Sequence, residues 1–133
     1  MEKILHLNYD GSIAEIQQEF NNMYSFLRIQ FYRISGVGSQ PKERKVIVST
    51  SLLRAANLTR EGTIVVDNNM TVAELERKFS EDFGLTIQVT RQSGILWLET
   101  TVTNNMSLQQ QNEHGMEITC GVGKTARLDG GSR

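Results

Sequence analysis

The fold of this chain is decided by Ser12-Ile13-Ala14-Glu15-Ile16 with Phe20 one turn later, which recurs as Thr71-Val72-Ala73-Glu74-Leu75 with Phe79. In each copy a hydroxyl residue and a glutamate have capping-box spacing, in which the hydroxyl accepts the N3 amide and the carboxylate accepts the cap amide. The apolar residues that follow recur at helical period. The sequence therefore predicts two capped amphipathic helices that each bury one face against a sheet.

The similarity continues beyond the helices. Leu27 to Phe31 aligns with Leu85 to Val89, and both segments alternate apolar and polar residues as a strand with one buried face does. The turns that follow, Arg33-Ile34-Ser35-Gly36 and Arg91-Gln92-Ser93-Gly94, also align. The offset between copies is 59 residues in the helix (12 to 71) and 58 in the strand (27 to 85). Because cap, helix, strand and turn recur in order, we expect an internal duplication.

The remaining elements follow from shorter patterns. We expect a strand over 3–9, edge strands over 46–48 and 95–98, short helical segments over 51–56 and 106–111, and closing strands over 62–66 and 115–119. The repeated unit is therefore strand, helix, strand, strand, short helix, strand. The sequence predicts an α+β fold with a largely antiparallel sheet and two main helices on one face.

Length and composition predict one domain over 1–120, made of two similar halves at about 1–62 and 63–120. The glycine-rich segment 121–133 is expected to be a flexible tail. With 133 residues, 38% hydrophobic and 22% charged, the chain is ordinary for a globular protein. Its net charge of -1 does not give the basic footprint of a dedicated nucleic-acid binder.

The expected location is the cytoplasm. A single cysteine, Cys120, excludes an internal disulfide and suits a reducing compartment. The apolar stretch near Met1 is too short and too interrupted for a signal peptide, and no run of residues is long and apolar enough to span a bilayer. We therefore expect a soluble protein that does not enter a membrane.

Part of the second half resembles a known set of proteins. The segment from Met70 to Val89, followed by Asn104-Asn105-Met106-Ser107-Leu108, is similar to small bacterial proteins of unassigned function. Those proteins pair a TVxxLxxxFxxxFGLxxxV segment with a later xxxxTL segment. The match covers mainly 70–108, with a degraded copy at 11–33. The resemblance implies a bacterial α+β protein and supplies no catalytic residue.

Catalytic and metal-binding motifs are weak. The segment from Cys120 to Thr125 ends like a phosphate-binding loop, but Ile118 stands where that motif needs its first glycine. His6, His114 and Cys120 do not have a recognised zinc spacing. The helical carboxylates are explained by capping and solvation. We therefore expect no enzyme, no cofactor and no bound metal.

A binding surface is predicted on the outward positions of the first-half strand. Its candidate residues are Arg28, Gln30, Tyr32 and Arg33, with Lys42, Arg44 and Lys45 nearby. Aromatic and basic residues on a sheet are typical of surfaces that stack bases, so binding of single-stranded nucleic acid is one hypothesis. The matching positions of the second half are uncharged. Binding of another protein to the exposed strand is therefore the preferred interpretation.

Trp97 is the remaining candidate. It alternates with Leu96 and Leu98, so the three side chains cannot share one face of a strand. Either this strand is buried from both sides or covered by the tail, which is the favoured interpretation, or Trp97 anchors a partner or dimer surface. The sequence thus predicts a non-catalytic module for protein interaction or assembly that binds another protein or a second copy of itself.

Overall fold

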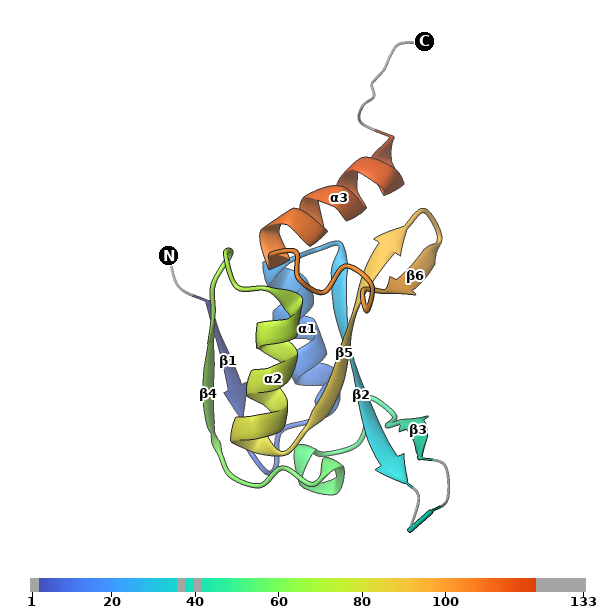
Figure 1. Cartoon of the computed structure of the whole chain (residues 1–133). Helices are drawn as coiled ribbons and strands as arrows, with labels where there is room; N and C mark the ends of the chain where they lie inside the picture. The colour runs from blue at the N-terminus through green and yellow to red at the C-terminus, as the bar shows by residue number, and fades with distance from the viewer. Residues whose placement is uncertain (1–2, 36–37, 40–41, 122–133) are drawn as a thin grey trace.

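The computed structural model describes residues 3–35, 38–39 and 42–121. These residues form an α+β fold (Figure 1). The elements are β1 (Lys3–Leu7), α1 (Ile13–Met23), β2 (Leu27–Ser35), β3 (Glu43–Val46), the short 3-10 helix η1 (Leu53–Ala56), β4 (Gly62–Val66), α2 (Val72–Phe83), β5 (Thr86–Ser93), β6 (Leu96–Glu99) and α3 (Leu108–Cys120).

Both predicted capping boxes are present. Ser12 and Thr71 accept the N3 amides of α1 and α2, and the N3 glutamates accept the cap amides in return. α3 begins with a third box, at Ser107. Local hydrogen bonding therefore sets where each helix begins. The two main helices end differently, because α2 stops at Gly84 in the left-handed region (φ 70°) and α1 stops at Tyr24 in an extended conformation.

The strands form two antiparallel sheets instead of the single sheet expected. β1 pairs with β4 as a two-stranded ladder, and the other strands form a four-stranded sheet in the order β3-β2-β5-β6. The ladder and the sheet lie on opposite sides of the molecule, with α1 and α2 between them (Figure 1). The helices therefore fill the space that separates the inner faces of the two sheets.

One hydrophobic core joins the two halves. It receives alternate residues from the ladder and from β2 and β5, together with the apolar stripes of α1 and α2. Phe31 of the first half meets Phe79 of the second edge to face, with ring centroids 5.9 Å apart. Because each half completes the burial of the other, neither half has a separate core.

Strand registers place matching residues of the two halves opposite one another. Leu5 pairs with Ile64 across the ladder, an offset of 59, and Gln30 pairs with Gln88 across the central strands, an offset of 58. These are the offsets of the sequence alignment. A twofold relation between the halves and their common origin by duplication stay predictions.

The closing strand predicted over 115–119 is wrong. These residues belong to α3, and the short helical segment predicted over 106–111 contains only the start of that helix. Gly115 marks a close helix-sheet contact, because a Cβ at this position would lie 3.0 Å from both Arg91 Cγ and Phe26 Cβ. His114 and Cys120 therefore also lie in a helix, and the second unit ends without a strand.

The edge strand predicted over 46–48 forms earlier in the chain. β3 covers Glu43–Val46, and its last main-chain bond runs from the Ile47 N–H to the Phe31 carbonyl, 2.9 Å away. All four β3 residues are exposed, so the strand carries no alternation of apolar and polar residues that could reveal it. Apart from Gly121, the tail predicted over 121–133 lies outside the described residues.

Candidate functional site

The outer face of the four-stranded sheet brings two predicted site residues together. Arg28 projects from β2 across β5, and its guanidinium carbon lies 3.8 Å from the ring centroid of Trp97 on β6. Gln92 of β5 pairs with Trp97, so the indole shares the outer face with Arg28. Trp97 is half-buried under this cation-π contact.

Tyr32 forms a second stack on the same face. The guanidinium of Arg44 lies 4.1 Å from its ring centroid and also pairs with the Glu99 carboxylate. Burial raises the pKa of Tyr32, Arg44 opposes the rise and Glu99 adds to it. Each of these two rings is therefore covered by an arginine. A nucleobase would have to displace that arginine before it could stack.

The other predicted residues lie apart from these stacks. Gln30 occupies the centre of the sheet opposite Gln88, whose side chain is buried. Arg33 donates to the Ala55 carbonyl of η1, so its guanidinium is used in a contact within the chain. The structure thus joins Arg28 with Trp97 and leaves Arg33 outside that group.

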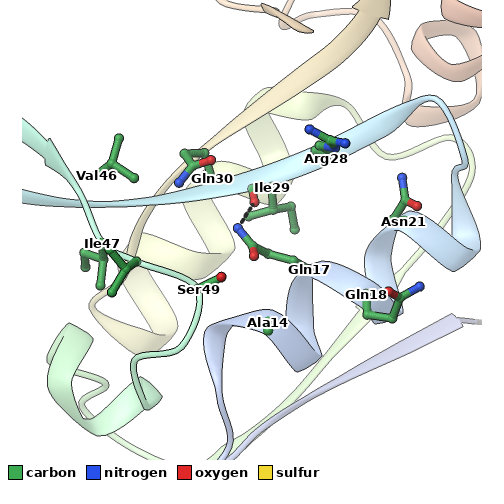
Figure 2. A pocket seen from close by; sticks show the side chains of 11 residues that line it. Ala14, Gln17, Gln18, Asn21, Arg28, Ile29, Gln30, Val46, Ile47 and Ser49 are labelled. Carbon is green, nitrogen blue, oxygen red and sulfur yellow. Dashed lines mark hydrogen bonds between the residues drawn. The ribbon is translucent and has the colours of Figure 1, made fainter.

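A groove of about 560 Å³ lies between α1 and the four-stranded sheet (Figure 2). It is lined by α1 from Ala14 to Asn21, by β2 at 28–30 and by the segment 46–49 that follows β3. Arg28 is the only charged residue in this lining. The sequence does not indicate the groove, because its amide and aliphatic residues carry no chemical motif.

The floor of the groove is an open edge of β2. β3 pairs with β2 only from Tyr32 to Ser35, so among the described residues the earlier part of β2 has no neighbouring strand on this side. Two amide side chains of α1 satisfy its carbonyls: Gln17 Nε2 donates to Ile29 O over 2.8 Å and Asn21 Nδ2 donates to Leu27 O over 2.9 Å. Side chains therefore occupy positions where an adjacent strand would donate its main-chain N–H groups.

The matching edge of β5 is capped differently. Glu76, which corresponds to Gln17, accepts the Val89 N–H over 3.2 Å and the Gln88 side-chain amide over 3.3 Å. The Thr100 hydroxyl donates to the Val89 carbonyl over 2.8 Å. Burial raises the pKa of Glu76, the bond from Val89 opposes the rise and Glu99 adds to it. The carboxylate of Glu76 thus caps an N–H of this edge, whereas amides cap carbonyls of the edge in the first half.

Large apolar side chains are exposed on β6 and on the turn that precedes it. Ile95 is 95% exposed, Leu96 59% and Leu98 42%. The prediction that this strand is buried from both sides is therefore wrong, while cover by the tail falls outside the described residues. Trp97 faces the opposite side of the strand from these leucines.

The neighbouring side of α3 extends this apolar surface. Gln111 contacts Arg91, which pairs with Leu98, and Ile118 lies two turns further along the same side of the helix. The Gly94 N–H of the β5-β6 turn donates to Thr119 Oγ1 over 3.1 Å, so the end of α3 lies beside this turn. Ile118 is 44% exposed. We name Ile95, Leu96, Leu98 and Ile118 the β6 surface.

Catalytic and metal-binding groupings are sparse in the part of the chain that the structure describes. A smaller hollow of about 370 Å³ contains His6, whose Nδ1 lies 3.8 Å from Glu19 Oε2. Both side chains are exposed. Within residues 3–35, 38–39 and 42–121, no three His, Cys, Asp or Glu side chains gather closely enough to hold a metal ion. None of the helices described has the length and hydrophobicity needed to cross a bilayer.

The chain matches no protein-family model and shows no significant similarity to the curated proteins or solved structures with which it was compared. The resemblance of 70–108 to small bacterial proteins therefore stays a prediction.

Proposed function

We propose that this protein is a non-catalytic interaction module that docks another protein chain on the β6 surface. The observation that carries the proposal is an edge strand whose large side chains are apolar and exposed. An exposed apolar edge strand offers main-chain hydrogen bonds and hydrophobic burial to the same partner. Proteins otherwise protect such edges, because they promote association.

The opposite edge of the same sheet supports this interpretation. In β3, Glu43 lies opposite Ser35 and Lys45 lies opposite Arg33. At the matching positions of β6, Leu96 lies opposite Ser93 and Leu98 lies opposite Arg91. Charges therefore occupy in β3 the positions that leucines occupy in β6. Since charged residues deter strand pairing, the sheet has one protected edge and one edge suited to association.

The proposal includes an origin of the two halves from one duplicated unit. Isolated bridges join Ser12 to Leu52 in the first half and Thr71 to Ser107 in the second, at aligned positions. Duplication would explain how β6 could acquire a binding role while β3 kept the charged residues that deter strand pairing. A reducing compartment such as the cytoplasm suits the free and exposed Cys120.

The test gives β6 the edge residues of β3. We expect Leu96→Glu/Leu98→Lys to remain folded by circular dichroism and to lose self-association in light scattering or the partners captured from the native host. Ile4→Lys is the matched control, because Ile4 is 42% exposed on β1, outside the β6 surface. A wild-type protein that stays monomeric and captures the same proteins as the double variant would refute the proposal.

A further inference from the structure

The open edge of β6 presents the main-chain groups of Trp97. Gln92 lies opposite Trp97 in the sheet, and its N–H donates to the Phe26 carbonyl, at the start of β2, over 3.0 Å. The main chain of Gln92 therefore points away from β6. Because directly opposite residues of an antiparallel pair exchange both bonds or neither, the Trp97 N–H and carbonyl point away from β5 and into the open edge. Leu96 and Leu98, on either side, direct theirs to β5.

The sequence of this edge is symmetric about Trp97. Leu96 precedes Trp97 and Leu98 follows it, and both leucines lie on the face of the strand opposite the indole. If two copies of β6 pair antiparallel about Trp97, each Leu96 lies opposite Leu98 of the other copy, and the two Trp97 residues exchange both main-chain bonds. A twofold interface needs a surface that is complementary to itself. This strand meets that requirement in its main chain and in its side chains.

Charge also favours a second copy over a charged partner segment. Glu99 is the only charged residue of β6, and its carboxylate pairs with Arg44 of the same chain. In the register centred on Trp97, Glu99 lies opposite the uncharged Ile95 of the other copy, so pairing brings no like charges together across the edge. The net charge of -1 per chain adds little long-range repulsion between copies. β6 therefore accepts a copy of itself and has little to attract a charged strand.

The exposed apolar area is sufficient for a reversible dimer. The exposed parts of Ile95, Leu96, Leu98 and Ile118 together exceed two complete side chains per copy. If burying one such side chain removes about 100 Å² from water, two copies lose roughly 500 Å² of apolar surface from these residues alone. A specific interface buries about 1,200–2,000 Å² in total, somewhat more than half of it apolar. The β6 surface thus supplies most of the apolar area that a small interface needs.

We infer that β6 pairs with β6 of a second copy of this chain, antiparallel and centred on Trp97, so that the two four-stranded sheets join into one. This inference rests on the proposed function and names the chain that docks on the β6 surface. Association stops at two chains, because both edges of the joined sheet are then β3 strands, which carry the exposed charges of Glu43, Arg44 and Lys45.

The first test measures the register with disulfide bonds. In a Cys120→Ser background, Leu96→Cys and Leu98→Cys are purified separately, one with an isotope label, then mixed and oxidised. We expect at least about tenfold more mixed disulfide dimer than either variant forms alone, because opposite positions lie about 4.5 Å apart at Cα and equal positions about 7–8 Å apart. Val65→Cys mixed with Leu98→Cys is the matched control, because Val65 and Leu98 are both 42% exposed and Val65 lies on β4.

The second test measures association itself. Sedimentation of the wild type over a concentration series should show a monomer-dimer equilibrium in the micromolar range. Leu96→Lys/Leu98→Lys, which places like charges opposite one another in this register, should remain folded by circular dichroism and sediment as a monomer. The inference is overturned if the wild type stays monomeric throughout the series, or if the mixed disulfide dimer does not exceed its controls. A monomeric wild type whose captured host proteins are lost in the double variant would overturn the inference and leave the proposed function standing.

Discussion

In the first half Gln17 donates its side-chain amide to the Ile29 carbonyl, whereas in the second half Glu76, at the matching helix position, accepts the Val89 N–H. The helices and strands around these residues are alike. The two halves therefore differ in the side chains that cap the edges of the sheet, and not in the residues of the core. The amide of Gln17 caps a strand carbonyl, while the carboxylate of Glu76 caps a strand N–H.

A second difference concerns the segments that follow the edge strands. The first half continues into the 3-10 helix η1, and the second half continues into α3, which contains 13 residues. α3 reaches β2 as well as β5, because Asn112 accepts the Phe26 N–H over 2.8 Å. The two halves share one core but have different surfaces: a polar groove in the first half and the apolar β6 surface in the second.

The largest expected effect tests whether the halves form one unit. Phe20 and Phe79 occupy matching positions and are fully buried. Replacing either by alanine should lower the free energy of unfolding by about 3–5 kcal/mol, because each change removes a large side chain from the shared core. Urea unfolding followed by circular dichroism should show a single transition for both variants. Two separate transitions would show that the halves unfold independently.

A smaller effect concerns Gly84, the residue at which α2 ends. Gly84 has φ 70°, and a Cβ there would lie 2.5 Å from Thr59 Cγ2. Gly84→Ala should therefore cost about 2–3 kcal/mol, through backbone strain together with this clash. Gly94→Ala is the control, because Gly94 has φ 66° and no atom of the described residues lies within 4 Å of where its Cβ would be. It should cost only about 1 kcal/mol. Equal losses in thermal unfolding would argue against the clash.

The stack on the outer face should contribute about 0.5–1 kcal/mol. Arg28→Ala removes the guanidinium that covers Trp97, the only tryptophan of the chain, so the fluorescence emission should shift to longer wavelength. Arg44→Ala uncovers Tyr32 instead and should leave that emission unchanged. We also expect single-stranded DNA at low salt to leave the emission of wild type unchanged. A DNA-dependent shift that Arg28→Ala abolishes would favour the nucleic-acid hypothesis.

The smallest effect concerns the capping carboxylate. Burial raises the pKa of Glu76, so between the ordinary pKa of glutamate and the raised value the folded protein binds more protons than the unfolded chain. The free energy of unfolding should therefore fall as pH rises through this window, and Glu76→Gln should remove that slope. The change should stay below about 1 kcal/mol, because Glu76 is partly exposed to solvent.

Glu74, on the same helix, should give the opposite pH dependence of the free energy of unfolding. Hydrogen bonds from Thr71 lower its pKa, so its stabilising contribution should be lost on acidification. Urea titrations of wild type, Glu76→Gln and Glu74→Gln at several pH values would separate the two slopes. If Glu76→Gln leaves the wild-type slope intact, the carboxylate does not act as described.

The sequence was informative wherever local chemistry controls the structure. The capping boxes at Ser12 and Thr71 predicted where α1 and α2 begin, because a cap needs particular residues at fixed spacing. The alternation along Leu27 to Phe31 predicted β2, because burial of one face leaves a periodic pattern. The strand predicted from Gly115 is wrong, because a glycine before apolar residues is also typical of the start of a strand. The actual role of Gly115 is to let α3 approach Arg91 and Phe26, which are distant in sequence.

The candidate site was predicted only in part. Alternation indicated that Arg28 and Tyr32 face outward, but it could not show that Arg28 covers Trp97 or that Arg44 covers Tyr32. Those contacts depend on how strands far apart in sequence are aligned. The groove was missed for the same reason, because it forms where β3 ends early beside α1.

The amino-acid sequence by itself determined the capped helices, the main strands and the apolar faces that these elements bury, since these depend on near-neighbour hydrogen bonds and periodic hydrophobicity. Tertiary structure alone decided which edges stay open, which arginines cover aromatic rings and which leucines remain exposed. The physical reason is that strand register and helix docking fix the neighbours of each side chain, and residues brought together from separate segments set those positions.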